Sequence, residues 1–111
     1  MKFSILSLST ALVASLSFLA PVLAEDASLY AGGGYTVKIV GFAGSASYTG
    51  CDRKNRCLTI PEASNYSRGS YVWENEGYTY SMSPVGSSGK YRLRIFNPKG
   101  KALLNQVMNP K

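Results

Sequence analysis

The sequence contains no histidine, only two cysteines and only six acidic residues in 111. The absence of histidine removes the side chain that most often acts as a general base or metal ligand near neutral pH. Two cysteines without histidine also make a poor zinc site, because such a site takes four ligands. After residue 24 the chain has no apolar run near the ~20 residues of a membrane-spanning helix. We therefore expect no metal, no cofactor and no membrane span in this part of the protein.

Residues 1–24 carry the three-part pattern of a cleavable secretory signal peptide. Lys2 gives a positive start, residues 5–19 are apolar but diluted by serine and threonine, and Pro21 precedes small residues at the cleavage site. An uncleaved anchor helix is the alternative, although the apolar stretch is short and rich in serine for a membrane span. The pattern predicts cleavage before Glu25 and an exported protein, either periplasmic or secreted.

The part of the chain that remains after cleavage contains both cysteines, which we expect to be linked covalently. Removing 24 of the 111 residues leaves 87, which is enough for one small domain. A domain of this size buries only about 60% of the surface that its unfolded chain exposes, so a covalent link is valuable. Cys51 and Cys57 flank the polar segment 52–56, and an oxidising compartment favours a bond between them. The sequence therefore predicts a disulfide, for which the loop-entropy model gives roughly 2 kcal/mol.

Strand signals follow one another at short intervals from residue 35 onward. β-Branched or aromatic residues alternate with polar ones, and glycine, proline and asparagine separate the runs. The pattern predicts about seven strands, at residues 35–40, 45–51, 57–60, 71–74, 78–82, 90–96 and 101–108. The turns at 52–56, 75–77 and 97–100 predict three hairpins. We expect an all-β fold, a small antiparallel meander closed into a barrel or sandwich.

Two segments are predicted to be irregular. Three consecutive glycines at 32–34 cost too much backbone entropy for a regular element, so residues 25–34 are expected to form a flexible N-terminal arm. Residues 62–69 are expected to form a polar connection with at most one helical turn. A single small β-domain would then extend over residues 35–111.

Cations alternate with apolar residues along the strand predicted at 90–96. Side chains of a strand point to opposite faces in turn, so the apolar residues enter the core and the cations face outward. The cations of this strand, with two from the next turn and strand, form a candidate anion-binding face: Lys90, Arg92, Arg94, Lys99 and Lys101. The formal charge of +6 becomes +5 once Lys2 is removed, which favours anionic partners. The alternative is a solvated face that maintains solubility and protects a sheet edge.

Catalytic and nucleic-acid-binding functions find little support. Glycoside hydrolysis needs two carboxylates across a cleft, and Glu74 and Glu76 share one turn, where acidic residues are typically solvated. No nucleophile and base can be paired, so we expect no catalytic residues and no enzyme.

Residues 41–44 are similar to one half of a β-barrel RNA-binding motif, but the other half is missing. The export signal also argues against nucleic acid as a partner.

Two families share features with this chain. The strings Tyr-Thr-Gly-Cys-Asp at 48–52, Trp-Glu-Asn-Glu-Gly-Tyr at 73–78 and Tyr-Arg-Leu-Arg-Ile-Phe-Asn-Pro at 91–98 resemble those of small uncharacterised exported proteins of the cyanobacterial type. That resemblance covers most of the chain after the signal peptide. It implies no activity.

The second resemblance is to the periplasmic C-type lysozyme inhibitors, which are small exported β-barrels with a disulfide. Ser88-Gly89-Lys90-Tyr91 and the Lys-Gly pair at 99–100, followed by an apolar strand, approximate the signature of that family. The spacing departs from it: one residue is missing before Tyr91, and the two halves lie closer together. The resemblance implies that Ser88 and Lys99 enter the lysozyme cleft and meet its catalytic carboxylates.

The sequence as a whole favours an exported, non-enzymatic binding module for an anionic partner, such as an envelope polymer or an acidic protein. A lysozyme-inhibitor-like protein is the first alternative, and a small hydrolase is the second.

Overall fold

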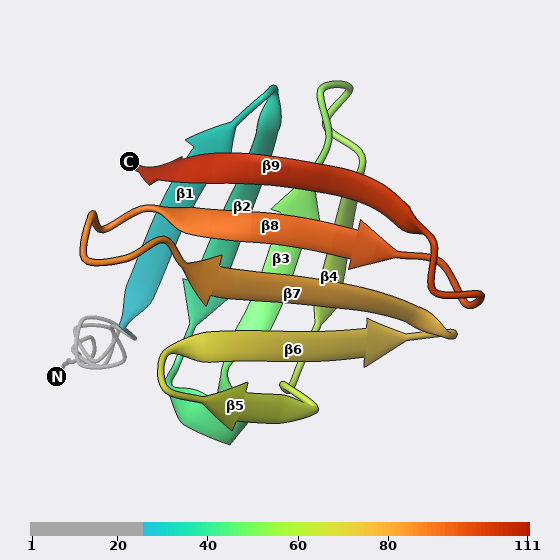
Figure 1. The fold of residues 1–111 in the computed structure, drawn as a ribbon, viewed down its shortest axis with the longest axis horizontal. Coiled ribbons are helices and arrows are strands. Elements are labelled where there is room, and N and C mark those ends of the chain that lie inside the picture. The colour runs from blue at the N-terminus through green and yellow to red at the C-terminus, as the bar shows by residue number, and fades with distance from the viewer. Residues whose placement is uncertain (1–25) are drawn as a thin grey trace, which may run out of the picture.

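The computed structural model describes residues 26–111, and Figure 1 shows that this part of the chain is built almost entirely of strands. The predicted signal peptide, residues 1–24, lies outside the described residues. Nine antiparallel strands form one sheet in the order β4-β3-β2-β1-β9-β8-β7-β6-β5. Their bounds are β1 Ala27–Gly32, β2 Tyr35–Val40, β3 Ser47–Cys51, β4 Cys57–Ile60, β5 Asn65–Ser67, β6 Ser70–Asn75, β7 Tyr78–Pro84, β8 Tyr91–Phe96 and β9 Ala102–Pro110.

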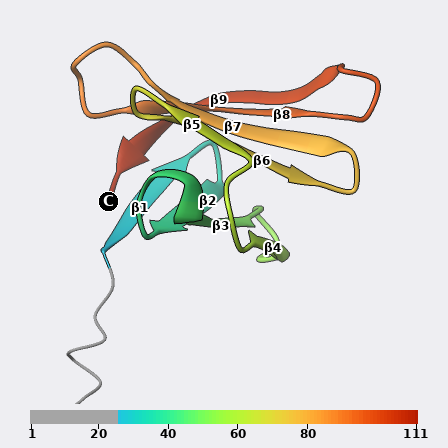
Figure 2. The same ribbon diagram turned by 90° about the horizontal axis from the view of Figure 1, so that it is seen from below.

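The sheet curls into a half-barrel with two facing layers. Figure 2 shows β1–β4 as one layer and β5–β9 as the other, and in Figure 1 the strands of the second layer run across those of the first. The layers are continuous on one side, where Tyr30 and Ala31 of β1 pair with Pro110 and Asn109 of β9. β4 and β5 end the sheet order on the other side. The predicted all-β antiparallel fold is therefore confirmed, with nine strands instead of seven.

The space between the layers is filled by residues from both of them. The buried apolar residues are Val37, Ile39, Ala46, Tyr48, Ile60, Tyr71, Trp73, Met82, Leu93 and Met108. Trp73 of β6 is fully buried, and its ring lies 5.2 Å from that of Tyr71 and 5.0 Å from that of Tyr48. Its indole Nε1 donates a hydrogen bond of 3.0 Å to the Ala46 carbonyl of the other layer. The core thus satisfies the one polar atom that this large side chain brings into it.

The prediction of a flexible arm at residues 25–34 is wrong for the residues that the structure describes, because residues 27–32 form β1, which pairs along its whole length with β2. Gly33 and Gly34 have φ values of 59° and 88° and make the tight turn between the two strands. Gly32 stands where β1 meets β9, and a Cβ there would collide with the Val107 carbonyl oxygen. The three glycines therefore form a tight turn and allow a close contact between strands, and β1 belongs to the same sheet as the strands predicted after residue 35.

The second missing strand is β5, within the connection expected at 62–69. It pairs with β6 through three residues and is followed by a turn in which Arg68 and Gly69 have φ values of 52° and 85°. A strand of three residues is too short to show a periodic pattern, and this explains the omission. The seven predicted strands are present, with ends that differ from the prediction by a few residues at most.

Candidate anion-binding face

β8 places its cations and its apolar residues on opposite sides, as the alternation along the strand predicts. Leu93 is fully buried, and Tyr91 and Ile95 pack against the core. Arg92 and Arg94 therefore lie on the outer face of the layer formed by β5–β9, where both side chains are half-buried. They are neighbours along the strand, about 6–7 Å apart, since alternate residues of a strand repeat at that distance.

The cross-strand neighbours of the two arginines are uncharged, and three of the four are polar; the fourth is Val107 of β9, opposite Arg92. Arg94 stands opposite Ser81 of β7 and Asn105 of β9, and Arg92 stands opposite Ser83 of β7. Arg92 Nη1 donates a hydrogen bond of 2.8 Å to Asn105 Oδ1. Within residues 26–111 the one ion pair joins two residues of the β3–β4 loop, far along the chain from β8. No carboxylate of the described chain therefore pairs with either guanidinium.

Arg94 also carries an unsatisfied donor. Its Nε is buried and has no hydrogen-bond partner within residues 26–111. A buried donor without a partner typically costs about 1–3 kcal/mol. A buried arginine Nε without an acceptor is unusual, because buried donors are generally hydrogen-bonded to a carbonyl or carboxylate oxygen.

The three lysines of the predicted face extend it beyond both ends of β8. Lys90 comes directly before the strand, and its carbonyl accepts a 2.9 Å hydrogen bond from the Val85 amide across the hairpin. Lys99 and Lys101 follow the strand in the β8–β9 turn, where Asn97 Oδ1 accepts from both backbone amides at 2.9 Å. All three lysine side chains are exposed. Lys90 shares the alternation of Arg92 and Arg94, whereas Lys99 and Lys101 lie in and after the turn beyond the other end of the strand.

Ser88 lies in the β7–β8 loop and Lys99 in the β8–β9 turn, so the pair implied by the resemblance to lysozyme inhibitors is separated by the length of β8. Figure 1 shows these two connections at opposite ends of the strand. A strand of six residues spans roughly 20 Å. The Ser88 hydroxyl is engaged within its own loop, donating to the Val85 carbonyl at 2.7 Å and accepting from the Lys90 amide at 3.1 Å. The structure does not bring these two side chains together on one loop.

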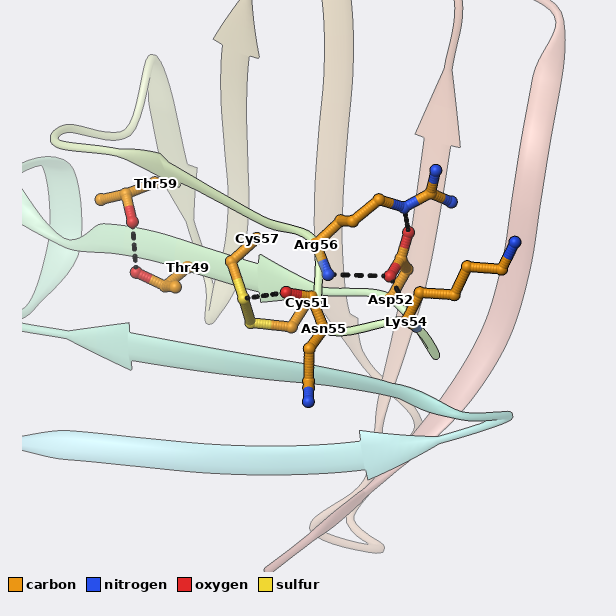
Figure 3. The surroundings of a disulfide bond; sticks show 8 residues. All are labelled: Thr49, Cys51, Asp52, Lys54, Asn55, Arg56, Cys57 and Thr59. Carbon is orange, nitrogen blue, oxygen red and sulfur yellow. Dashed lines mark hydrogen bonds and ion pairs between the residues drawn. A yellow bond between two sulfur atoms is a disulfide. The ribbon is translucent and has the colours of Figure 1, made fainter.

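The predicted disulfide between Cys51 and Cys57 is present, and the loop that it closes contains a basic pocket that the sequence analysis missed. The two cysteines stand opposite each other in the β3–β4 register, with Cα atoms 4.1 Å apart (Figure 3). The pocket has a volume of about 290 Å³ and is lined by Tyr35, Asp52, Arg53, Lys54 and Arg56. The available signal was the density of charge: three of the five residues between the cysteines are cations.

Asp52 organises this loop. Its Oδ1 accepts from the Lys54 amide at 2.8 Å and from the Arg56 amide at 3.0 Å, and its Oδ2 accepts from Arg56 Nε at 2.7 Å. These contacts, the Arg56 amide first, hold the pKa of the Asp52 carboxyl below its usual range. The carboxylate is therefore a fixed internal partner of the loop.

The other acidic residues within residues 26–111 form no comparable arrangement. Glu74 and Glu76 are exposed at the β6–β7 hairpin. Among the described residues, no three histidine, cysteine or acidic side chains come close enough to hold a metal ion. The same part of the chain has no helix of the length and apolarity that a bilayer crossing requires. Comparison with protein families, curated proteins and solved structures gives no match to this chain.

Proposed function

We propose that this protein is an exported, non-enzymatic binding domain that engages an anionic partner along the outer face of β8. The observation that carries the proposal is the pair Arg92 and Arg94, adjacent, half-buried and without a carboxylate partner in the described chain. The signal-peptide pattern, the disulfide and the positive charge support export and an anionic partner.

Two guanidinium groups held side by side repel each other, and partial burial strengthens that repulsion because it lowers the effective dielectric constant. An oxyanion would remove the repulsion and accept charge-assisted hydrogen bonds. Ser81 and Ser83 stand beside the arginines on β7, and their hydroxyls are further donors. Because Lys90 lies before the strand, and Lys99 and Lys101 add positive charge in the turn beyond its other end, an extended anionic polymer of the cell envelope fits this face best.

The two alternatives have less support. The lysozyme-inhibitor-like function draws no support from Ser88 and Lys99, which lie at opposite ends of β8. A small hydrolase would require a buried acid or a nucleophile with its base, and the candidate carboxylates Glu74 and Glu76 are exposed.

A matched pair of variants tests the proposal. Arg92→Gln/Arg94→Gln removes two charges from β8, and Lys38→Gln/Lys111→Gln removes one charge from β2 and one from the residue after β9. Binding of the mature protein to sulfated dextran is measured by titration calorimetry at low salt. We expect the arginine variant to bind at least about tenfold more weakly, equivalent to ~1.4 kcal/mol. The lysine variant should change affinity by less than about twofold, as expected for screened surface charges.

Two results would contradict the proposal. An equal loss in both variants would mean that only net charge matters. Unchanged binding of the arginine variant would mean that the β8 row is a solvated strand face.

A further inference from the structure

The pocket closed by the disulfide is a second basic site, separate from β8. It is formed by the β3–β4 loop and the start of β2, and Tyr35 provides its aromatic wall. Figure 3 shows the side chains of Lys54 and Arg56 extending in the same direction, away from the disulfide, with the Asp52 carboxylate between them. Three cations and one carboxylate line the pocket, so its formal charge is +2.

Both arginines of the pocket are held through their Nε atoms. Arg53 Nε donates to the Gly33 carbonyl at 3.0 Å, and Arg56 Nε donates to Asp52 Oδ2 at 2.7 Å. No hydrogen bond within residues 26–111 uses the Nη atoms of either side chain. The Arg56 side chain is also 73% exposed, so its terminal nitrogens are accessible to a ligand. The contacts that orient the two guanidinium groups thus leave their outer ends free to donate.

The β1–β2 turn and the disulfide preorganise this arrangement. A Cβ at Gly34 would overlap the Arg53 side chain, so the glycine lets the arginine lie across the turn and reach the Gly33 carbonyl. The disulfide fixes the two ends of the loop that carries Asp52 and Arg56. Preorganised donors bind more tightly because less conformational entropy is lost when the ligand arrives.

We propose that this pocket binds a phosphate-type dianion, with Arg53 and Arg56 donating from their Nη atoms and Lys54 supplying the third charge. The charge of −2 on such a group matches the +2 of the pocket. The multiple oxygens of a tetrahedral anion match the forked donors of two guanidinium groups better than a single carboxylate does. The pocket volume leaves room beside Tyr35 for the group that carries the phosphate.

The test is an NMR titration of the isotopically labelled mature protein with inorganic phosphate and, separately, with glucose 6-phosphate. The signals of Arg53, Lys54 and Arg56 should shift with both ligands. Glucose 6-phosphate should bind more tightly as the pH rises from 5 to 7, because a phosphate monoester gains its second charge near pH ~6. Acetate at the same concentration should cause at most small shifts.

Matched variants make the assignment specific. Arg53→Gln/Lys54→Gln keeps the Asp52–Arg56 pair and should weaken phosphate binding at least about tenfold. Arg68→Gln, at the exposed β5–β6 turn, should leave phosphate binding at the pocket unchanged, as followed by the signals of Arg53, Lys54 and Arg56. The signals of the same three residues should respond to phosphate in Arg92→Gln/Arg94→Gln as they do in the wild type. This last result separates the pocket from the β8 face, so either proposal can fail without the other.

Vesicles of phosphatidylcholine with phosphatidate distinguish a lipid headgroup from a free phosphate ester. Tighter binding to the vesicles than to glucose 6-phosphate identifies the lipid source, and equal or weaker binding identifies the free ester. Equal shifts with acetate and phosphate, or unchanged binding in Arg53→Gln/Lys54→Gln, would overturn the proposal.

Discussion

Single side chains connect the two layers of this half-barrel at defined points. Trp73 belongs to the layer of β5–β9, yet its indole nitrogen bonds to the carbonyl of Ala46, just before β3 in the other layer. Tyr48, on β3, packs its ring against Trp73 from the opposite side of the core. Within the β3–β4 loop, the Asp52 carboxylate accepts three hydrogen bonds from Lys54 and Arg56. The geometry of both regions therefore depends on a few atoms.

Trp73→Phe should lower the free energy of unfolding by about 2 kcal/mol. The change removes the hydrogen bond, leaves the Ala46 carbonyl unpaired and opens space in the core. Urea denaturation followed by circular dichroism measures the loss. Tyr78→Phe, at a side chain that is 37% exposed, is the control and should change stability by less than about 0.5 kcal/mol. If Trp73→Phe also lowered the free energy of unfolding by less than about 0.5 kcal/mol, the indole hydrogen bond would contribute little to stability.

The Asp52 carboxyl predicts how the loop responds to acid. Its pKa is lowered in the folded protein, so its hydrogen bonds are fully formed above the unfolded value near pH ~3.9 and are lost as the pH falls through the folded value. In an NMR pH titration, the amide signals of Lys54 and Arg56 should therefore shift with a midpoint below ~3.9. Asp52→Asn should abolish that transition. A midpoint above ~4 would show that the carboxylate is not stabilised by the loop.

At the scale of elements, glycines decide where the chain turns and where strands meet. The sequence indicates strong elements such as β2 and β8 well, because six residues of alternating pattern show the period of a strand. It indicates β1 poorly, because the same three glycines, residues 32–34, are expected both in a flexible arm and in a tight turn. In the structure, Gly33 and Gly34 form the turn, and Gly32 allows β9 to approach closely. The contact between Arg53 and the Gly33 carbonyl joins residues 20 apart, and no local pattern encodes it. For that reason the β8 face could be predicted from the sequence, whereas the density of charge between the cysteines indicated a basic loop but not the pocket that Arg53 completes at the β1–β2 turn.

Gly32→Ala tests the junction at which the two layers become one sheet. The added methyl group would collide with the Val107 carbonyl, which belongs to the backbone of β9 and cannot move without disturbing the pairing. We expect a loss of about 1–3 kcal/mol in the free energy of unfolding. Gly44→Ala is the matched control, since no atom lies within 4 Å of the new methyl group, and it should change stability by less than about 0.5 kcal/mol. Equal stability of the two variants would mean that β1 and β9 can separate without cost.

At the scale of the whole molecule, one covalent bond and one continuous sheet hold a small core together. The disulfide fixes the β3–β4 hairpin near the end of the sheet order, where β4 has a neighbour on one side only. The basic pocket belongs to this hairpin, and the β8 row lies in the other layer, between β9 and β7. The protein thus presents two separate cationic surfaces on one sheet.

Cys51→Ser should lower the free energy of unfolding by about 2 kcal/mol, because the short closed loop no longer restricts the unfolded chain. The same variant should weaken phosphate binding at the pocket while leaving the binding of sulfated dextran to β8 nearly unchanged. Denaturation and the two titrations, run on the same preparation, measure these effects. Equal weakening at both surfaces would show that the disulfide acts on the whole fold and not on its own loop.

The most direct test of the β8 face uses the side-chain signals of the arginines themselves. The Nε–H resonances of Arg92 and Arg94 are followed by NMR while native anionic envelope polymer is added to the labelled mature protein at low salt. We expect these two signals, with the amides of Ser81, Ser83 and Asn105 beside them, to shift first and most strongly. If neither arginine signal shifted while signals elsewhere on the molecule did, the proposal that the β8 face binds the polymer would be contradicted.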